Sequence, residues 1–205
     1  MQHWDDSSWT ELSTPGFGEA IEGSLVDVSA DTHDDAWAVG SKGQPSFRDR
    51  QVVAEHWDGT SWTASPAPDA SFNDVLAGVS ALKPNDVWAV GSYSTGGTGR
   101  NHMLIEHWDG SAWTIVPHQD ILGELDAVEA IASNDAWAVG SSGGQTLAMH
   151  WDGTSWTRVP TPNKTTATNS LMDVSARSSS SILAVGTVDA GQPFRGLTLV
   201  LSWNG

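Results

Sequence analysis

A tryptophan-marked repeat constrains this chain more than any other feature of its sequence. Five tryptophans recur at intervals of 53, 51, 43 and 52 residues, in the related sequence motifs HWDD, HWDG, HWDG, HWDG and SWNG. A second tryptophan follows five residues after each of the first four, and a third series lies in DAWAVGS, DVWAVGS and DAWAVGS. Leu183 takes the fourth place of that third series. The three series are Trp4, Trp57, Trp108, Trp151 and Trp203; Trp9, Trp62, Trp113 and Trp156; and Trp37, Trp88 and Trp137.

Each repeat unit is expected to form four short β-strands. In the second unit the strands are predicted around residues 76–81, 87–90, 103–108 and 113–116, where apolar and β-branched residues dominate between turn residues. Asp109-Gly110 is a hairpin signal between the third and fourth strands, because glycine adopts positive φ at little cost. A helical period does not continue for ten residues anywhere in the chain.

Units of four antiparallel strands and about 40–50 residues are typical of β-propeller blades. We therefore predict an all-β, four-bladed propeller in a single domain, residues 1–205, with blades near 25–66, 75–117, 125–160 and 171–203. The last blade lacks its fourth strand, and residues 8–13 read as a fourth strand without a blade. The N-terminal strand is therefore expected to complete the last blade and close the ring. A fragment of a larger propeller, and two chains pairing into an eight-bladed ring, are the alternatives.

The repeat WxVGS…HWDGxxW resembles the propeller repeats of actinobacterial secreted proteins. This resemblance covers nearly the whole chain and implies an extracellular location, although the chain itself shows no signal peptide. The repeat is also loosely similar to tryptophan-rich propeller lectins. Its Asp-Gly-Thr-Ser-Trp turn is similar to the Asp-box turn of sialidase-like propellers, but the spacing differs, so no catalytic residue is carried over from that family.

The charge balance excludes some functions. With 9 basic and 25 acidic residues, the net charge of −16 repels nucleic-acid phosphates and anionic lipid headgroups. No apolar run reaches the roughly 20 residues of a membrane-spanning helix. The sequence contains neither a phosphate-binding loop nor a dinucleotide fingerprint, so we expect no cofactor. The expected protein is a monomer or, alternatively, a dimer.

The long connections of the predicted propeller are the expected binding surface. They join second to third strands and one blade to the next, and binding residues concentrate on such loops. Six of the nine basic residues fall in them. Arginine suits carboxylates, phosphates and hydroxyl pairs, and a neighbouring aromatic ring suits a sugar or an aromatic ligand. The predicted ligand-binding residues are Lys42, Phe47, Arg48, Arg50, Tyr93, Arg100, His102, His118, Phe194 and Arg195.

We therefore expect a ligand-binding module for a glycan or a small anionic or aromatic ligand on the long-loop face. The alternative for the basic residues is ion pairing with local acids such as Asp49 and Asp189. A second hypothesis is a small enzyme of the hydrolase, lyase or cyclase type, with one acid–base site near the axis on the same face, built from His102, His118 or Asp120. The unequal loops of the blades motivate this enzyme hypothesis, because a repeat lectin would carry the same ligand-binding residues in every blade. A third hypothesis is a protein-binding scaffold.

A metal site has little support in the sequence, because no ligand spacing typical of zinc occurs. Asp27 and Asp173 occupy equivalent first-strand positions near the predicted axis, where carboxylates are able to hold a cation. Hydrogen bonding to neighbouring backbone is the alternative, and the one we favour.

Overall fold

The protein is described by a computed structural model, which covers residues 1–4, 7–15, 17, 22–43, 49–96, 101–164, 167–189 and 196–203. All regular secondary structure in these ranges is β-strand, and none of it is a helix that could cross a membrane. The strands form three four-stranded sheets, one three-stranded sheet and one two-stranded hairpin, in which every pairing is antiparallel. The predicted all-β fold with four-stranded antiparallel sheets is therefore confirmed.

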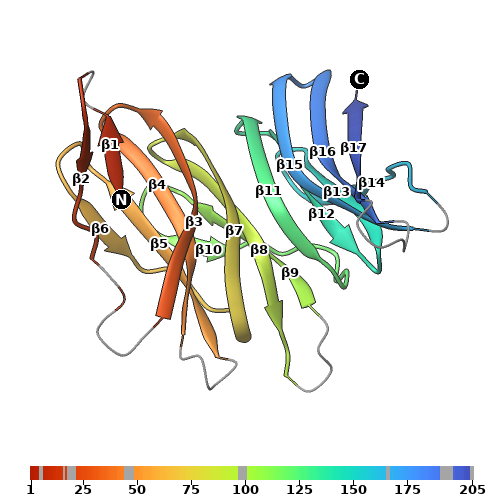
Figure 1. Ribbon diagram of the computed structural model, residues 1–205, viewed down its shortest axis with the longest axis horizontal. Helices are drawn as coiled ribbons and strands as arrows, with labels where there is room; N and C mark the ends of the chain where they lie inside the picture. The colour runs from red at the N-terminus through yellow and green to blue at the C-terminus, as the bar shows by residue number, and fades with distance from the viewer. Residues whose placement is uncertain are drawn as a thin grey trace.

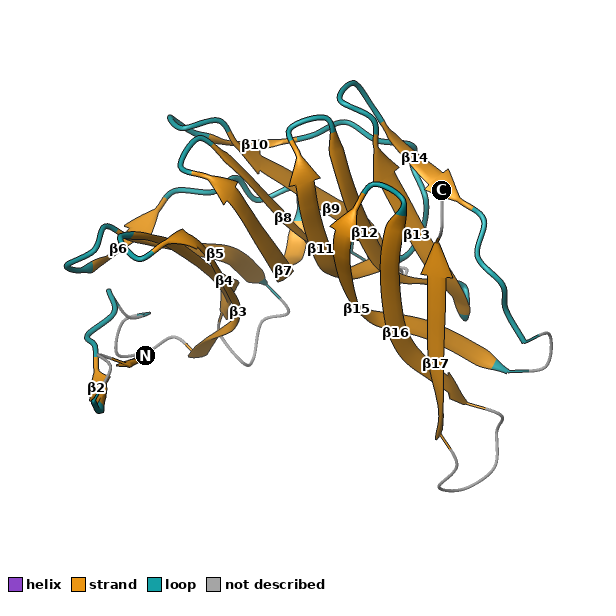
Figure 2. Ribbon diagram, turned by 90° about the horizontal axis from the view of Figure 1, so that it is seen from above, coloured by secondary structure: helices purple, strands orange, loops and turns teal. Residues whose placement is uncertain are grey.

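The sheets follow one another along the chain as blades of an arc (Figures 1 and 2). The N-terminal hairpin is β1 (Gln2–Trp4) and β2 (Trp9–Glu11). Blade 1 is β3 (Glu22–Thr32), β4 (Asp35–Gly43), β5 (Arg50–Trp57) and β6 (Trp62–Ser65). Blade 2 is β7 (Phe72–Lys83), β8 (Asp86–Ser94), β9 (Asn101–Trp108) and β10 (Trp113–Ile115). Blade 3 is β11 (Glu124–Ala132), β12 (Asp135–Ser142), β13 (Gln145–Trp151) and β14 (Trp156–Val159). Blade 4 is β15 (Thr168–Ser178), β16 (Ser181–Asp189) and β17 (Gly196–Trp203).

Tryptophans hold neighbouring blades together. The second-strand Trp37 of blade 1 packs against Trp108 and Trp113 of blade 2, with ring centroids 4.9 and 5.1 Å away. Trp88 of blade 2 contacts Trp151 and Trp156 of blade 3 at 5.0 and 5.1 Å. The fourth-strand ring meets the buried second-strand ring edge-on in both cases, which is a favoured aromatic geometry. The tryptophans of the repeat thus form the same inter-blade contact between blades 1 and 2 and between blades 2 and 3.

The histidines of the repeated His-Trp motifs have a structural role within the blades. His107 and Asp86 share a hydrogen bond of 2.8 Å between Nε2 and Oδ1, and His150 and Asp135 share one of 2.9 Å. His56 pairs with Asp35 in the same way. Each pair joins the third strand to the start of the second. Blade 4 has Ser202 and Ser181 at these positions, so it lacks this pair.

The turn between third and fourth strands is fixed by an aspartate. Asp152 Oδ1 accepts hydrogen bonds from the Thr154 hydroxyl at 2.7 Å and from the Thr154 and Ser155 amides at 2.8 and 2.9 Å. These bonds, led by the one from the hydroxyl, lower the pKa of Asp152 to about 2. Asp58 and Asp109 repeat the arrangement. The Asp-Gly turns are therefore structural.

The predicted ring closure is not present in this structure. Instead of pairing with β17, β2 pairs with β1, and β17 has only β16 as a neighbour among the described strands. The hairpin lies against blade 1, where Met1 and Leu12 pack against the apolar cluster that Ala36, Ala38, Trp57 and Trp62 form. The physical reason is that β1 repeats the end of a third strand, so β2 finds its partner within its own hairpin. The two chain ends consequently lie at opposite ends of the arc (Figures 1 and 2).

Candidate functional site

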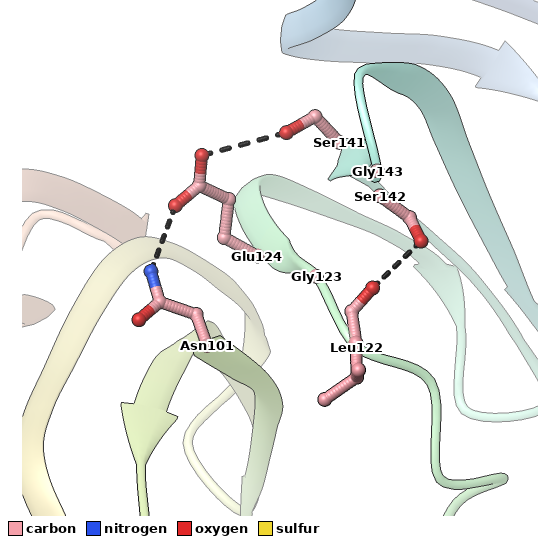
Figure 3. A pocket seen from close by; sticks show the side chains of 7 residues that line it. All are labelled: Asn101, Leu122, Gly123, Glu124, Ser141, Ser142 and Gly143. Carbon is pink, nitrogen blue, oxygen red and sulfur yellow. Dashed lines mark hydrogen bonds between the residues drawn. The ribbon is translucent and has the colours of Figure 1, made fainter. Parts of the chain in front are cut away.

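The face that carries the long connections contains two hollows at the same place in two different blades. One lies in blade 3, has a volume of about 500 Å³ and is drawn in Figure 3. The other lies in blade 1 and has a volume of about 210 Å³. Both are formed by the first residues of a first strand and the last residues of the adjacent second strand. The lining of the first is Asn101, Leu122, Gly123, Glu124, Ser141, Ser142 and Gly143, and that of the second is Glu22, Gly23, Ser24, Ser41, Lys42, Gly43 and Arg50.

The blade 3 hollow is organised around one carboxylate. Glu124 accepts hydrogen bonds from Asn101 Nδ2 at 3.2 Å and from the Ser141 hydroxyl at 3.4 Å (Figure 3). Asn101 comes from blade 2, and its carbonyl oxygen accepts a bond of 2.9 Å from the Gly123 amide. This hollow therefore needs residues from two adjacent blades. It offers hydroxyl, amide and carboxylate groups, which suit a polyhydroxylated ligand.

A second acid lies two residues beyond Glu124. Burial, together with the negative charge of Glu124, raises the pKa of Asp126 to about 6. A carboxyl group that titrates there is able to exchange protons near neutral pH. The sequence had not marked Asn101, Glu124 or Asp126 as site residues. Comparing blades 1 and 3 position by position would have shown Glu124 as a departure from the repeat, because blade 1 has Ser24 in its place.

The blade 1 hollow carries cations where the blade 3 hollow does not. Lys42 takes the place of Ser142, and Arg50 at the start of β5 lines the same hollow. Neither side chain forms an ion pair with any carboxylate of the described residues. Glu22 also lines this hollow, so the lining includes one carboxylate residue and two cationic residues.

An aromatic ring lies beside the blade 1 hollow. A Cβ built on Gly23 would lie 2.6 Å from ring atoms of Phe17, so the ring lies directly against this glycine. Gly23 is itself part of the hollow's lining. Two of the predicted ligand-binding residues, Lys42 and Arg50, are thus brought together, and Phe17 joins them from the preceding link.

The structure brings His102 and Asp120 together, next to Tyr93. His102 Nδ1 lies 3.0 Å from Asp120 Oδ1, and the His102 ring stacks on Tyr93 with centroids 5.1 Å apart. His118 takes other partners: its Nδ1 bonds to the Gln119 carbonyl at 2.9 Å, and its backbone bridges to Trp156. The predicted acid–base set therefore divides into a His102–Asp120 pair and a separate His118.

This histidine pair lies outside the blade 3 hollow. Asn101 and His102 are consecutive residues of β9, and consecutive strand residues point to opposite faces. Asn101 faces the hollow, so His102 faces away from it. Asp120 follows Pro117 by three residues, as Asp69 follows Pro66 and Asn163 follows Pro160. Asp69 and Asn163 each accept a hydrogen bond from a third-strand amide, those of Val52 and Thr146. Asp120 lies at the equivalent position of blade 2, but its hydrogen bond is to the His102 side chain.

The axial acids are engaged with backbone. Asp27 accepts hydrogen bonds from the amides of Val28 at 2.9 Å and of Val79 in blade 2 at 2.8 Å. Asp173 accepts one from Val174 at 2.9 Å. No group of three or more side chains able to hold a metal ion occurs in the described ranges. Five predicted ligand-binding residues lie outside those ranges: Phe47, Arg48, Arg100, Phe194 and Arg195.

The fold is β-propeller-like: four-stranded antiparallel sheets follow one another as blades, without a closed ring. No family model matches the sequence, and no curated protein matches it. Among solved structures, the chain is similar to Ycf48 from Cyanidioschyzon merolae, a seven-bladed β-propeller. The TM-score is 0.55 at 15% identity, over 89% of this chain and 51% of that one. A structure of Ycf48 bound to a D1 peptide has a TM-score of 0.46 at 12% identity, over 86% of this chain and 68% of that one. The chain thus spans about half the length of the first protein, and at this identity the likeness shows the fold alone.

Proposed function

We propose that this chain is a ligand-binding propeller module that holds an anionic glycan in the hollow of blade 1. The observation that carries the proposal is the lining of that hollow by Lys42 and Arg50, neither of which pairs with a described carboxylate. In a chain with a net charge of −16, two cations in one hollow are a local reversal of charge. Such a reversal favours a ligand with a carboxylate, sulfate or phosphate group.

The neighbouring groups extend this preference to a sugar. The hydroxyls of Ser24 and Ser41 line the hollow and are able to donate and accept hydrogen bonds, and the Glu22 carboxylate is able to accept them. Phe17 supplies an apolar ring at the edge, on which the C–H face of a sugar is able to pack. Phe47 and Arg48 belong to the connection between Gly43 and Asp49, and their part in binding stays a prediction. The same proposal places the protein outside the cell, because its repeat resembles those of secreted proteins.

Replacing Lys42 with serine, the residue that blade 3 has at this position, is expected to weaken binding of glucuronic acid at least tenfold. A hydrogen bond to a charged group contributes about 1.5–3 kcal/mol, which corresponds to roughly 10- to 150-fold in affinity. Calorimetric titration with glucuronic acid and with glucose measures the effect, because the two sugars differ at one carboxylate. Arg158→Ala, an exposed arginine on β14, is the control and should bind like the original chain. Equal binding of both sugars, no binding of either, or full binding by Lys42→Ser would contradict the proposal.

The second candidate function is acid–base catalysis at His102. Asp120 fixes Nδ1, so Nε2 is the nitrogen left to act on a substrate. The equivalent residues Asp69 and Asn163 accept hydrogen bonds from third-strand amides, which is a structural role, so this is the weaker candidate. Turnover in a panel of chromogenic glycosides and esters that is lost in His102→Gln and kept in His118→Gln would favour the enzyme. Absence of turnover by the original chain would contradict the enzyme hypothesis.

A further inference from the structure

The two ends of the arc expose the two halves of one interface. Each inner blade packs one face on the preceding blade and the other on the next, and valine at one first-strand position always faces the preceding blade. That valine is 5% exposed in blade 2 (Val79) but 59% exposed in blade 1 (Val28). The second-strand residue that faces the next blade is 2% exposed in blade 2 (Trp88) and 53% exposed in blade 4 (Leu183). Both leftover faces are apolar and lack the blade that covers them elsewhere.

Blade 4 also lacks the strand that completes every other blade. Among the described residues, nothing pairs with the outer edge of β17. Trp137 of blade 3 contacts Trp203 at 5.6 Å, but in the described part of the chain it has no edge-on tryptophan of the kind that Trp37 and Trp88 have. An apolar cavity of about 80 Å³ lies beside it, lined by Trp137, Pro160 and Trp203 among others. The missing element is therefore a fourth strand that begins with tryptophan.

The chain carries such a strand at its other end. Trp9 of β2 pairs with Trp4 in the register that pairs Trp62 with Trp57 and Trp156 with Trp151. The Trp9 side chain is 66% exposed. Among the described strands, the first, second and third positions of four blades are filled, and β2 brings the number of fourth strands to four, while β1 is an additional short third-strand segment. The hairpin already lies on blade 1, where the blade preceding blade 1 would place its own outer strands.

We propose that two copies of this chain pair head to tail, with β2 of each copy exchanging its pairing with β1 for pairing with β17 of the other and so completing blade 4 as its fourth strand. The three-residue β1 leaves the third-strand place that it occupies on blade 1, and β17 of the other copy takes that place. Blade 4 of one copy then packs on blade 1 of the other, which continues the inter-blade contact already formed three times within the chain. Two such contacts, related by a two-fold axis, close a ring of blades. The tryptophan of β2 pairs with Trp203 and fills the cavity beside Trp137.

A second copy suits this structure better than closure within one chain. The N-terminal hairpin and β17 lie at opposite ends of the arc (Figures 1 and 2). The three internal contacts are close-packed, with tryptophan centroids 4.9 to 5.6 Å apart, so bringing the ends together would require all three to change. A second copy leaves them unchanged. It also places a preceding blade beside the blade 1 hollow, as blade 2 stands beside the blade 3 hollow and contributes Asn101.

Cysteine cross-linking tests this pairing directly, because the chain contains no cysteine of its own. In the other blades the residue before the third-strand tryptophan pairs with the residue after the fourth-strand tryptophan, as His150 pairs with Thr157. The proposal therefore pairs Ser202 of one copy with Thr10 of the other. Mixing Ser202→Cys and Thr10→Cys chains under oxidising conditions is expected to give a disulfide-linked product of twice the 21.7 kDa of one chain. Thr63→Cys replaces Thr10→Cys in the control, since β6 already has its partner strand and should not cross-link.

Two results would overturn the proposal. A cross-link that forms only within a Thr10→Cys and Ser202→Cys double variant, at the mass of one chain, would show closure of the ring on itself. No cross-link in either format would show that β2 does not reach β17, as expected if the edge belongs to a further strand of a longer chain.

Sedimentation provides a second measurement that does not depend on the cysteines. The original chain is expected to form dimers at micromolar concentration and at least 0.15 M salt, which screens the repulsion between two acidic chains. Leu183→Asp should weaken self-association at least tenfold while leaving the circular dichroism spectrum unchanged, because Leu183 is exposed in the single chain. A monomeric original chain, or a dimer that Leu183→Asp does not weaken, would also overturn the proposal.

Discussion

Replacing Trp88 with alanine is expected to lower the free energy of unfolding by about 3–5 kcal/mol, the range for a large aromatic residue in a core. Trp88 is buried and contacts three rings at once: Trp151 and Trp156 of blade 3, and His107 of its own blade. The truncation removes the contact between blades 2 and 3 at its centre and leaves a cavity there. Urea unfolding followed by tryptophan fluorescence and circular dichroism measures the loss, and agreement of the two signals tests whether unfolding has two states.

The same truncation at Trp137 is the matched comparison. Trp137 is equivalent to Trp88 but meets Trp203 without an edge-on partner from a fourth strand. An aromatic pair contributes about 0.5–1.5 kcal/mol beyond burial, so Trp137→Ala should cost less than Trp88→Ala by about that amount. If a second copy fills the cavity with Trp9, this difference becomes smaller as protein concentration rises. Arg158→Ala, on an exposed position, should change stability by less than about 0.5 kcal/mol. Equal losses for Trp88→Ala and Arg158→Ala would show that tryptophan packing does not hold the blades together.

The blades were predictable from sequence because the tryptophans that mark the repeat also form the contacts between blades. The strands are longer than the apolar pattern indicated: β7 begins at Phe72 and includes the polar pair Asn73 and Asp74. Asp74 is buried there because its carboxylate accepts hydrogen bonds from the Ser71 amide in the preceding link. A pattern of apolar residues does not predict the burial of an acidic side chain whose hydrogen-bond partners are backbone groups of a loop.

Ring closure was wrongly expected because residues 8–13 were read as a fourth strand without a partner, and no strand was assigned to the preceding His3-Trp4. These residues are the end of β1, which gives β2 a local partner in the register of every other third and fourth strand. A hairpin across a short turn forms at a much smaller entropy cost than pairing between strands nearly 200 residues apart. The sequence therefore indicated the number of fourth strands correctly. The pairing of β2 depended on β1, a three-residue strand that the repeat pattern does not require.

The candidate site was predictable in part. Lys42 and Arg50 were found because cations are rare in this chain and cluster in the long connections. Asn101 and Glu124 were not, since each is an ordinary polar residue at a strand end, and they meet only because blade 2 stands beside blade 3. A contact between residues of different blades follows from the packing of the sheets, which the repeat pattern alone does not define.

The buried acid Glu106 gives rise to the second large expected effect. Glu106 is 0% exposed, faces the contact between blades 1 and 2, and neither carboxylate oxygen has a hydrogen-bond partner among the described residues. Burial raises its pKa to about 8, and the nearby carboxylates of Asp69 and Asp74 act in the same direction. The equivalent residue of blade 3 is the buried Met149, so the fold accommodates an apolar side chain of similar length at this position.

The raised pKa makes the stability of the folded chain depend on pH. Below about pH 4.5, the usual value for glutamate, Glu106 is neutral in both the folded and the unfolded chain and costs nothing as a charge. As the pH rises toward 8, the unfolded chain releases this proton while the folded chain keeps it, so folding becomes less favourable by about 1.4 kcal/mol per pH unit. At pH 7 the accumulated cost is roughly 3 kcal/mol.

Glu106→Met is therefore expected to stabilise the chain by roughly 3 kcal/mol more at pH 7 than at pH 4, with urea unfolding across this range as the measurement. The pH slope is the diagnostic part, because a general improvement in packing would raise stability equally at every pH. Glu106→Gln is the control: it removes the titration of Glu106 and the share of the pH slope that this group contributes, but its amide leaves buried polar atoms without partners, so it should stabilise less than methionine. Val53→Met, at a position of β5 that faces away from Glu106, controls for added side-chain volume and should keep the slope. A Glu106→Met chain that is no more stable at pH 7, or that keeps the original pH slope, would show that Glu106 is ionised and satisfied in the folded state.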